Sequence, residues 1–361
     1  MKKSNQIKII IDPRCSYSYS SFYLYGLIQL FGHKSVSYSL KPFKNLKDPR
    51  LNLQFVVIKN NVTRRIFIHT RDVYQLDIDG YNWCDVYGHV NANFKYYPHD
   101  KYPKIRSLVP SYGIRVFSLF EMLGIAVCNF FKSLNSIIYR DEWNAKKDDC
   151  VINPIINIKL FFHRFYKGYE SRLPYEVYAN NERSEDNYVF FLSTLWFSDE
   201  YVENDKAVNR RRAHFIRACK MIQNITFEGG LYAKINSIRD EFVDVAVTER
   251  ISISEWVKKT KKSTFVFNTP AFSNCHGWKL GEYLAMGKCI ISTKLSNDLP
   301  APLEHGKHIH YVEDNVQSIK DAIEYIQANP EYRRRLEMGA SDYWNKYGNP
   351  IESLNLLGIN R

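Results

Sequence analysis

Apolar and polar positions along the second half of the chain predict strands that alternate with helices. Residues 188–192, 264–268 and 289–292 are short apolar runs with the length of buried strands. Longer segments between them carry apolar residues at helical spacing. Strands separated by such helices are typical of a parallel, doubly wound sheet. The elements expected beyond residue 187 are strands at 188–192, 243–247, 264–268, 289–292 and 309–312, and helices at 209–223, 253–261, 279–286, 316–328 and 330–347.

The first half of the chain opens as a strand, a polar loop and a helix. Polar residues dominate between Tyr169 and Asn187, and they predict a linker between two domains. We therefore expect an N-terminal domain at residues 1–180, a C-terminal domain at 181–345 and a C-terminal tail at 346–361. The elements expected in the first domain are strands at 8–11, 36–40 and 85–90, a hairpin of strands 55–58 and 65–69 around an Asn-Asn turn, and helices at 19–31, 114–131 and 154–168.

The longest apolar run, residues 114–131, has two interpretations. Its apolar residues recur at helical spacing, and it contains Arg115, Glu121 and Asn129. It therefore falls short of the roughly 20 uninterrupted apolar residues that a bilayer span needs. A buried core helix and a helix that docks on a membrane surface both fit this pattern.

The charge of the chain is strongly positive and favours anionic partners. The 361 residues include 50 Lys and Arg against 38 Asp and Glu, a formal net charge of +12. Such an excess attracts polyanions in general. No zinc-finger spacing, RNP-like aromatic run or Arg-rich tail accompanies it, so we expect no nucleic-acid partner. An anionic membrane surface together with a diphosphate ligand explains the charge better.

The cysteines and the N-terminus indicate the compartment. The seven Cys are odd in number and form no C-x-x-C pair, which is typical of buried thiols in a reducing compartment. The first residues lead directly into a short strand, without the longer apolar segment of a signal peptide. We therefore expect a cytoplasmic protein, with the inner face of the cell membrane as a peripheral location.

One section, residues 265–292, has a form suited to bind a phosphate. A buried strand ends in a polar loop, a helix begins near Trp278 and stops at Gly287, and a second buried strand follows. Ligands of open α/β sheets bind beyond the carboxyl ends of the strands, where free amides of helix N-termini favour phosphate. Lys279 is placed to neutralise a diphosphate, and Glu282, one turn further, can accept hydrogen bonds from both ribose hydroxyls. The spacing alone also fits an ordinary surface ion pair.

This section resembles the C-terminal donor domain of GT-B glycosyltransferases. The family pattern is a polar loop, a helix of the form R/K-x-x-E-x-(L/A)-A-x-G and a small buried strand. Lys279, Glu282, Ala285 and Gly287 match that helix in order. In the family the acid binds the nucleotide ribose and the basic residue lies beside the diphosphate. The resemblance covers about residues 185–345.

The resemblance implies an α/β protein of the GT-B fold, with two Rossmann-like domains facing across a cleft. It implies a nucleotide-sugar co-substrate, a UDP- or GDP-sugar, and no further cofactor. Such enzymes generally need no divalent metal, because helix dipoles and basic side chains carry the leaving diphosphate. Many retaining members carry a second Glu eight residues before the ribose-binding one. This chain has Asn274 there, which favours inversion.

Further donor-binding candidates lie at strand ends and at the starts of expected helices. Hydroxyls and amides after the strand at 188–192 can meet a phosphate, and the basic run that opens the next helix can reach it. A solvated basic helix start is the alternative for that run. The candidates besides Lys279 and Glu282 are His276, Gly277, Trp278, Ser193, Arg210 and Arg211.

An inverting transfer needs a general base that deprotonates the acceptor hydroxyl. Asp12 follows the first strand, and Asp85 and His89 form an acid/base pair near a strand end. All three are candidates, and a buried or capping role is the alternative for each.

Asp77-Ile78-Asp79 matches the Asp-x-Asp of metal-binding GT-A enzymes, but it lies far from the donor motif. We expect a solvated loop there and no metal site.

These observations predict an enzyme that moves a sugar from a nucleoside diphosphate to a glycan or lipid-linked acceptor. A role in bacterial surface polysaccharide synthesis, such as that of lipopolysaccharide, is expected from the charge and the family.

Two other classes of protein stay open. An epimerase or dehydrogenase would carry G-x-G-x-x-G after the first strand, and residues 12–18 contain no Gly. The second is a catalytically inactive nucleotide- or glycan-binding partner of the same fold.

Overall fold

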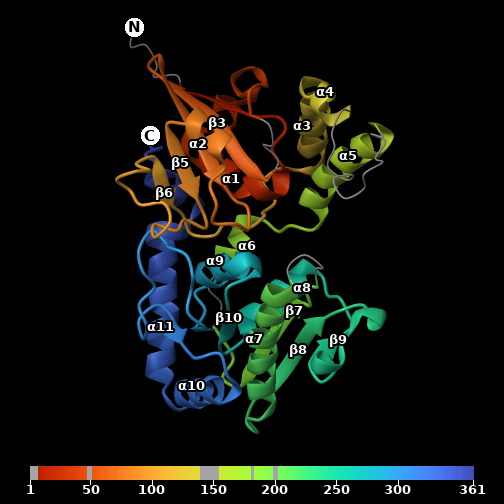
Figure 1. Ribbon diagram of the computed structural model, residues 1–361, viewed down its shortest axis with the longest axis vertical. Helices are drawn as coiled ribbons and strands as arrows, with labels where there is room; N and C mark the ends of the chain where they lie inside the picture. Colours follow the sequence, from red (N-terminus) through yellow and green to blue (C-terminus); the bar gives the residue numbers. More distant parts are fainter. Residues whose placement is uncertain (1–6, 47–50, 139–153, 180–182, 198–201) are drawn as a thin grey trace.

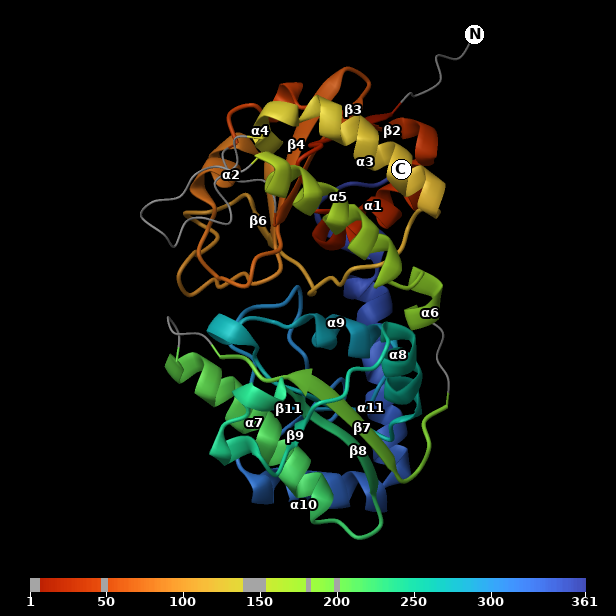
Figure 2. The ribbon, with the colours of Figure 1, turned by 90° about the vertical axis from the view of Figure 1, so that its right-hand side faces the viewer.

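Two α/β domains, joined by two crossings of the chain, make up the protein (Figure 1). The computed structural model describes residues 7–46, 51–138, 154–179, 183–197 and 202–361. The N-terminal domain lies at the top of Figures 1 and 2 and the C-terminal domain at the bottom, and each combines a sheet with helices on its faces. The expected fold class, α/β with two Rossmann-like domains, is confirmed.

A six-stranded sheet with the order β2-β1-β3-β4-β5-β6 forms the centre of the N-terminal domain. β3 runs antiparallel to both of its neighbours, and the other neighbouring pairs are parallel. The β3–β4 hairpin closes through Asn60 and Asn61, whose φ angles of 53° and 63° suit Asn in a tight turn. The carboxyl ends of β4, β5 and β6 therefore lie side by side. The strands are β1 (Lys8–Ile11), β2 (Val36–Tyr38), β3 (Asn52–Lys59), β4 (Val62–His69), β5 (Val86–His89) and β6 (Ile105–Ser107).

Helix α2 begins where the sequence predicts a solvated loop. Asp77 is its N-cap and accepts a hydrogen bond from the Gly80 amide at 2.8 Å, so the loop prediction is wrong.

The expected apolar helix is present as α3 and starts at a capping box of Ser118 and Glu121. No helix in the described part of the chain is long and apolar enough to cross a membrane. The helices are α1 (Tyr17–Phe31), α2 (Ile78–Trp83), α3 (Leu119–Lys132), α4 (Leu134–Ile138), α5 (Pro154–Glu170) and α6 (Tyr175–Ala179).

The C-terminal domain is built on parallel strands in two adjoining groups, ordered β9-β8-β7 and β10-β11-β12. The groups meet where the Thr264 amide, just before β10, donates to the Tyr188 carbonyl of β7 at 2.7 Å. Across this seam the strand order is that of a doubly wound sheet, with its topological switch point between β7 and β10. Val189 and Phe191 are buried in one core and Phe190 in another, as in a sheet covered on both faces.

The elements of this domain agree with the expected ones, with two exceptions. Helix α7 begins well before residue 209, and strand β8 is not among the expected elements, because Gly229 and Gly230 favour a turn over a strand. Glycine is needed there because a Cβ atom on Gly229 would lie 2.1 Å from the Phe191 carbonyl oxygen of β7. The strands are β7 (Tyr188–Thr194), β8 (Thr226–Tyr232), β9 (Ala246–Val247), β10 (Val266–Asn268), β11 (Ile290–Ser292) and β12 (His310–Tyr311). The helices are α7 (Val202–Lys220), α8 (Ile253–Lys262), α9 (Trp278–Ala285), α10 (Val316–Ala328) and α11 (Pro330–Tyr343). Short 3-10 turns lie at His33–Ser35, Lys41–Phe43, Ile235–Ser237, Asp240–Phe242 and Phe272–Asn274.

The segment 346–361, expected to be a C-terminal tail, returns to the N-terminal domain. After a π turn at Trp344–Gly348, helix α12 (Pro350–Leu356) packs against α1. A Cβ atom on Gly26 of α1 would lie 2.5 Å from the Pro350 carbonyl oxygen, so the two helices touch backbone to backbone. The Arg361 guanidinium donates to the carbonyls of Leu30 and Gln29 at the end of α1.

Backbone groups also join the two domains directly. The Asp298 amide donates to the Ala92 carbonyl at 2.8 Å, and the Phe94 amide donates to the Asp298 carboxylate at 2.6 Å. Helix α9 rests on the N-terminal domain at Gly281, where an added Cβ atom would lie 2.0 Å from the Pro110 carbonyl oxygen. No side chain larger than hydrogen fits at this contact without a shift of backbone.

We expect Gly281→Ala to push α9 away from the Pro110 carbonyl and to destabilise the protein by about 1–3 kcal/mol, the usual range for overpacking. Thermal unfolding of the variant and the wild type measures this. Gly124→Ala is the matched control, because Gly124 also lies in a helix but an added Cβ there meets nothing within 4 Å. The control should unfold at or slightly above the wild-type temperature, since Ala favours helix. Equal unfolding temperatures for Gly281→Ala and the wild type would show that the contact is loose.

Candidate functional site

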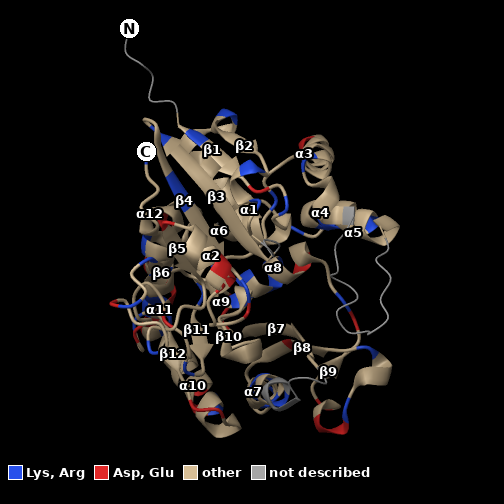
Figure 3. Ribbon diagram, turned by 45° about the horizontal axis from the view of Figure 1, so that its top comes forward, with Lys and Arg blue, Asp and Glu red and all other residues tan. Residues whose placement is uncertain are grey.

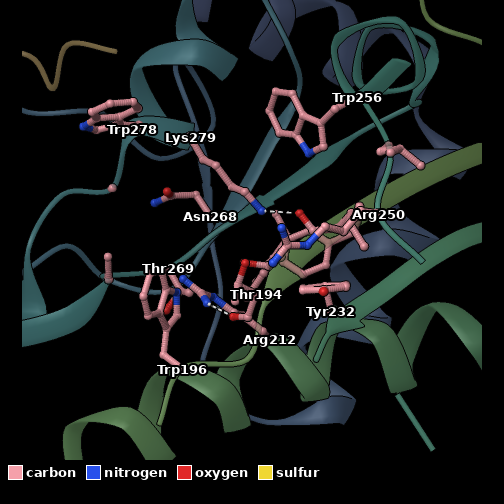
Figure 4. Close-up of a pocket in the computed structure, with 17 residues that line it drawn as sticks. Thr194, Trp196, Arg212, Tyr232, Arg250, Trp256, Asn268, Thr269, Trp278 and Lys279 are labelled. Atoms are coloured by element: carbon pink, nitrogen blue, oxygen red, sulfur yellow. Dashed lines mark hydrogen bonds between the residues drawn. The ribbon is translucent and has the colours of Figure 1, made fainter. Parts of the chain in front are cut away.

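A pocket of about 420 Å³ lies at the switch point of the C-terminal sheet (Figure 4). Its walls come from the carboxyl ends of β7, β8 and β10 and from the start of α9. Gly277 is the N-cap of α9 with no side chain, so the first amides of the helix stay open to a ligand. The lining residues are Phe191, Leu192, Ser193, Thr194, Trp196, Arg212, Tyr232, Arg250, Ile251, Trp256, Phe267, Asn268, Thr269, Ala271, Gly277, Trp278 and Lys279.

Basic side chains converge in this pocket. Lys279, Arg212 and Arg250 belong to its lining, and none of the described lining residues carries a carboxylate. The Lys279 ammonium donates to the Leu192 carbonyl at 2.6 Å, and the Arg212 guanidinium donates to the Thr194 carbonyl at 3.0 Å. Figure 4 draws both hydrogen bonds, which tie the two cations to the end of β7.

Two of these cations, Lys279 and Arg212, are partly removed from water, whereas Arg250 is exposed. Burial, with a smaller contribution from the charge of Arg212, lowers the pKa of Lys279 to about 7 against the opposing effect of Glu282. Burial also lowers the pKa of Arg212 to about 10. A desolvated cation without an anionic partner is unfavourable, so an anion that enters the pocket gains from both charges.

Aromatic rings form the rest of the walls. Trp196, Tyr232, Trp256 and Trp278 all line the pocket (Figure 4). The Arg250 guanidinium lies over the Tyr232 ring at 4.6 Å from its centroid, and the Lys279 ammonium lies over the Phe191 ring at the same distance. Such rings can stack on a nucleotide base or on the apolar face of a sugar.

The structure brings four of the predicted donor-binding residues into the pocket, namely Ser193, Gly277, Trp278 and Lys279. His276 lies behind them and is buried, with its amide donating to the Asn91 side-chain oxygen at 2.7 Å. Burial lowers the pKa of its imidazole to about 4. His276 therefore contacts the N-terminal domain and is not among the lining residues.

Glu282 shares helix α9 with Lys279 but is not among the residues that line the pocket. It is 8% exposed, and no hydrogen bond or ion pair reaches its carboxylate from the described residues. Burial raises its pKa to about 7, although Lys279 and Arg172 oppose this. Its charge acts on Tyr112 and Tyr178 of the N-terminal domain, whose pKa values rise mainly through burial and further through Glu282.

The basic run in α7 enters the pocket through Arg212 and not through the two predicted side chains. Arg210 is exposed, and Arg211 pairs with Asp314 at 3.5 Å. Successive residues of a helix point about 100° apart, so only one of the three can face the pocket. Burial of Val208, Arg212 and Phe215 follows the i, i+4, i+7 pattern. That spacing is the sequence signal that could have identified Arg212.

The three predicted base candidates lie apart from one another and from the pocket lining. The Asp12 carboxylate pairs with Arg14 at 2.7 Å and accepts from the Gln54 amide at 3.0 Å. Asp85 is exposed at the amino end of β5, where it accepts from the Arg65 amide at 2.7 Å.

His89, at the other end of β5, is fully buried. Its Nδ1 accepts from the Asn91 amide at 3.1 Å, and its Nε2 lies 3.3 Å from Nδ1 of His69. Burial lowers the pKa of His89 to about 4 and that of His69 well below the ordinary value. Both imidazoles are therefore neutral near pH 7. No group of three or more His, Cys, Asp or Glu among the described residues is placed to hold a metal ion.

Asp72 is a carboxylate at the domain junction that the sequence reasoning missed. It follows β4, and no described residue donates to it or pairs with it. Asp72 is exposed to solvent, but the neighbouring groups at the junction partly desolvate its carboxylate and raise its pKa. Its charge raises the pKa of Tyr19 and of Cys275, for both of which burial is the larger cause. Cys275 precedes helix α9, and the Tyr19 ring packs edge-on against Trp278 at 5.5 Å. The signal was the one used for Asp12, an acid just after a strand.

The backbone beside Asp72 is held against the C-terminal domain. The Asn91 side-chain amide donates to the Arg71 carbonyl at 3.0 Å, and the Asn91 side-chain oxygen accepts from the His276 amide at 2.7 Å. The Trp278 ring also lies under the Arg172 guanidinium, at 5.0 Å from its centroid. Asp72, Tyr19 and Arg172 therefore belong to the part of the N-terminal domain nearest to the pocket.

No model of a known protein family matches the chain, and no curated protein matches it. Several solved structures are similar in fold. The C-terminal domain of a glycosyl transferase group 1 family protein, LpcC, from Francisella tularensis is 12% identical, with a TM-score of 0.36 over 48% of this chain and 96% of that chain. S. aureus MnaA, in a co-structure with UDP, is 13% identical, with a TM-score of 0.38 over 78% of this chain and 73% of that chain. Anabaena HepE, in complex with UDP-glucose, is 10% identical, with a TM-score of 0.35 over 76% of this chain and 90% of that chain.

We expect Glu282→Gln to stabilise the protein in a pH-dependent way. The folded-state pKa of about 7 lies above the ordinary 4.5, so the fold favours the protonated carboxyl and loses stability as the pH rises from about 4.5 to about 7. The amide removes this loss. Chemical unfolding at pH 8 should therefore show the variant more stable by about 3 kcal/mol, the equivalent of that pKa difference.

The two proteins should be equally stable near pH 4. Glu249→Gln is the control, because Glu249 is exposed and its replacement should change nothing at either pH. A Glu282→Gln variant that is less stable than the wild type at pH 8 would show that the carboxylate is paired.

Proposed function

We propose that the protein is a glycosyltransferase that holds a nucleoside-diphosphate sugar in the switch-point pocket and transfers the sugar to an acceptor on the N-terminal domain. The observation that supports this most directly is the convergence of Lys279, Arg212 and Arg250 in a pocket whose described lining has no carboxylate. The pocket also lies at a helix N-terminus beyond the carboxyl ends of parallel strands, the place where such sheets bind phosphates.

In this proposal the diphosphate lies between Lys279, Arg212 and the first amides of α9. The base stacks on the aromatic side of the pocket, near Tyr232 and Trp256. The sugar then points past Trp278 toward the N-terminal domain. The donor is a UDP- or GDP-sugar, and fixed positive charges stabilise the leaving diphosphate without a metal ion.

Asp72 is the general base of the proposed reaction. Its carboxylate takes the proton from an acceptor hydroxyl, the hydroxyl oxygen bonds to the anomeric carbon, and the bond from that carbon to the diphosphate breaks. Attack from the face opposite the leaving group inverts the anomeric centre. A raised pKa makes Asp72 a stronger base than an ordinary carboxylate. Asp12, by contrast, already has its carboxylate paired with Arg14.

The acceptor in this proposal is a glycan or a lipid-linked glycan of a bacterial surface polysaccharide, such as lipopolysaccharide. The net charge of +12 suits an acceptor that carries phosphate or lies at an anionic membrane. An activity assay distinguishes this proposal from the alternative, a catalytically inactive binding protein of the same fold. Such a protein would bind nucleotide without hydrolysing or transferring any donor sugar.

We expect Arg212→Gln to weaken the binding of UDP or GDP at least tenfold, because it removes a buried cation that faces the diphosphate. This corresponds to about 1.4 kcal/mol or more. Lys279→Met should have a similar effect. Isothermal titration calorimetry with the free nucleotides measures both.

Arg210→Gln is the matched control, since Arg210 lies two residues earlier on the same helix but is exposed. It should bind nucleotide as the wild type does. Loss of affinity in Arg210→Gln together with wild-type affinity in Arg212→Gln would move the nucleotide to the solvent face of α7 and refute the proposed site.

We expect Asp72→Asn to lower kcat by about 10²–10⁴-fold, the range for loss of a general base, with an unchanged nucleotide Kd. The rise of kcat with pH that reflects deprotonation of the base should disappear in the same variant. Transfer or slow hydrolysis of a donor from a nucleotide-sugar panel provides the assay. Asp85→Asn, at the far end of β5, should keep wild-type rates, and the reverse outcome would return the role of base to Asp85.

A further inference from the structure

Helix α3 exposes an apolar stripe to solvent. Phe120 is 85% exposed and Phe131 is 70% exposed, and Leu123 and Val127 between them are about half exposed. The opposite side of the helix buries Met122, Ala126 and Asn129 in the domain core. A surface helix normally turns charged residues outward. The solvent-facing side of α3 therefore carries apolar residues where a helix in contact only with water carries charged ones.

The start of helix α5 continues the apolar surface. Ile155 is 66% exposed and Ile156 is 45% exposed. Helices α3 and α5 lie side by side (Figure 2). Their aromatic side chains pack together, with the ring centroids of Phe130 and Phe162 5.3 Å apart. We call Phe120, Leu123, Val127, Phe131, Ile155 and Ile156 the α3–α5 surface. Exposed apolar side chains on two helices that pack together are typical of an interaction site.

The charges around the α3–α5 surface are predominantly positive. Residues 115–138 and 154–170 contain five Lys or Arg against two Glu, a net charge of +3. One of the two acids, Glu121, is engaged in the capping box of α3, and the other, Glu170, bonds Lys167 at 2.6 Å. Figure 3 shows these helices as mainly uncharged ribbon with basic positions along them and an acidic position at the start of α3.

An apolar groove of about 460 Å³ adjoins the stripe on α3. Its walls include Ile28 of α1, Val36 and Tyr38 of β2, and Ile125 of α3. Lys132, at the end of α3, and His33 are the basic residues of the groove lining, which also includes Glu121 of the capping box. A groove of this shape and polarity suits a hydrocarbon chain whose charged head lies near Lys132.

We infer that the α3–α5 surface docks on an anionic lipid bilayer, with the two exposed Phe side chains inserted among the acyl chains. Apolar insertion and attraction of basic side chains to anionic headgroups together give stable but reversible binding. The inference goes beyond the transfer reaction, because it concerns where the protein lies, and it holds for any donor or acceptor.

Vesicle sedimentation tests this inference. The wild type should bind vesicles of phosphatidylcholine with phosphatidylglycerol, bind phosphatidylcholine alone weakly, and dissociate as salt is raised. The double variant Phe120→Ser, Phe131→Ser should bind the anionic vesicles more than tenfold more weakly than the wild type does. The control Ile235→Ser, Val243→Ser removes side chains of the C-terminal domain that are 73% and 63% exposed, and it should bind as the wild type does.

Both double variants should bind nucleotide like the wild type, so failure of membrane docking is distinguishable from failure of the donor site. Equal vesicle binding by the wild type and the Phe variant would overturn the inference. Light scattering tests the alternative that a second copy of the chain covers this surface. A wild-type dimer that the Phe variant converts to a monomer would assign the surface to self-association.

Cys128 provides a direct probe of insertion. It lies on α3, lines the groove and is exposed, whereas the other described cysteines are buried. With Cys150, which lies outside the described residues, replaced by Ser, an environment-sensitive fluorophore can be attached to Cys128. Its emission should shift to the blue with anionic vesicles and be quenched by brominated acyl chains. Unchanged emission in the presence of sedimenting vesicles would place the contact elsewhere on the protein.

Discussion

The contact between helix α9 and the N-terminal domain is the constraint on which the rest of the structure depends. Gly281 lies so close to the Pro110 carbonyl that the helix rests backbone to backbone on the other domain. Hydrogen bonds through Asn91 and Asp298 secure the same junction. The pocket side of this helix carries Lys279, and Trp278 packs against Tyr19. The contact therefore sets the position of both domains relative to a ligand in the pocket.

Removal from water, more than pairing, sets the charges along α9. Burial moves the pKa of Lys279 down and that of Glu282 up, both to about 7, and their mutual attraction offsets only part of each effect. An amine with a pKa near 7 takes up a proton readily when an anion comes close to it. The same helix thus supports the domain junction on one side and lines the pocket with a basic side chain on the other. Both properties follow from its position between two cores.

The section 265–292 could be predicted because its parts are consecutive in the sequence. The strand, loop and helix within 265–292 form in order, and Lys279 reaches the pocket as expected. Val208 and Phe215 mark the buried side of α7, so their spacing could have separated Arg212 from Arg210 and Arg211. The pairing of Asp12 with Arg14 and Gln54, and the junction around Asp72, depend on contacts between distant segments. Spacing along the chain carries no information about such contacts.

The return of the last residues to the first domain has a consequence for biosynthesis. Leu354, Leu357 and Ile359 are buried in the same core as Ile9 and Ile68 of the opening sheet. The ribosome releases these residues after the whole C-terminal domain, so the N-terminal domain emerges with part of its core uncovered. Contacts between segments so far apart in the sequence also form slowly. The two domains therefore mature together, and the nascent chain keeps an apolar face open to chaperones until residues 350–359 have emerged.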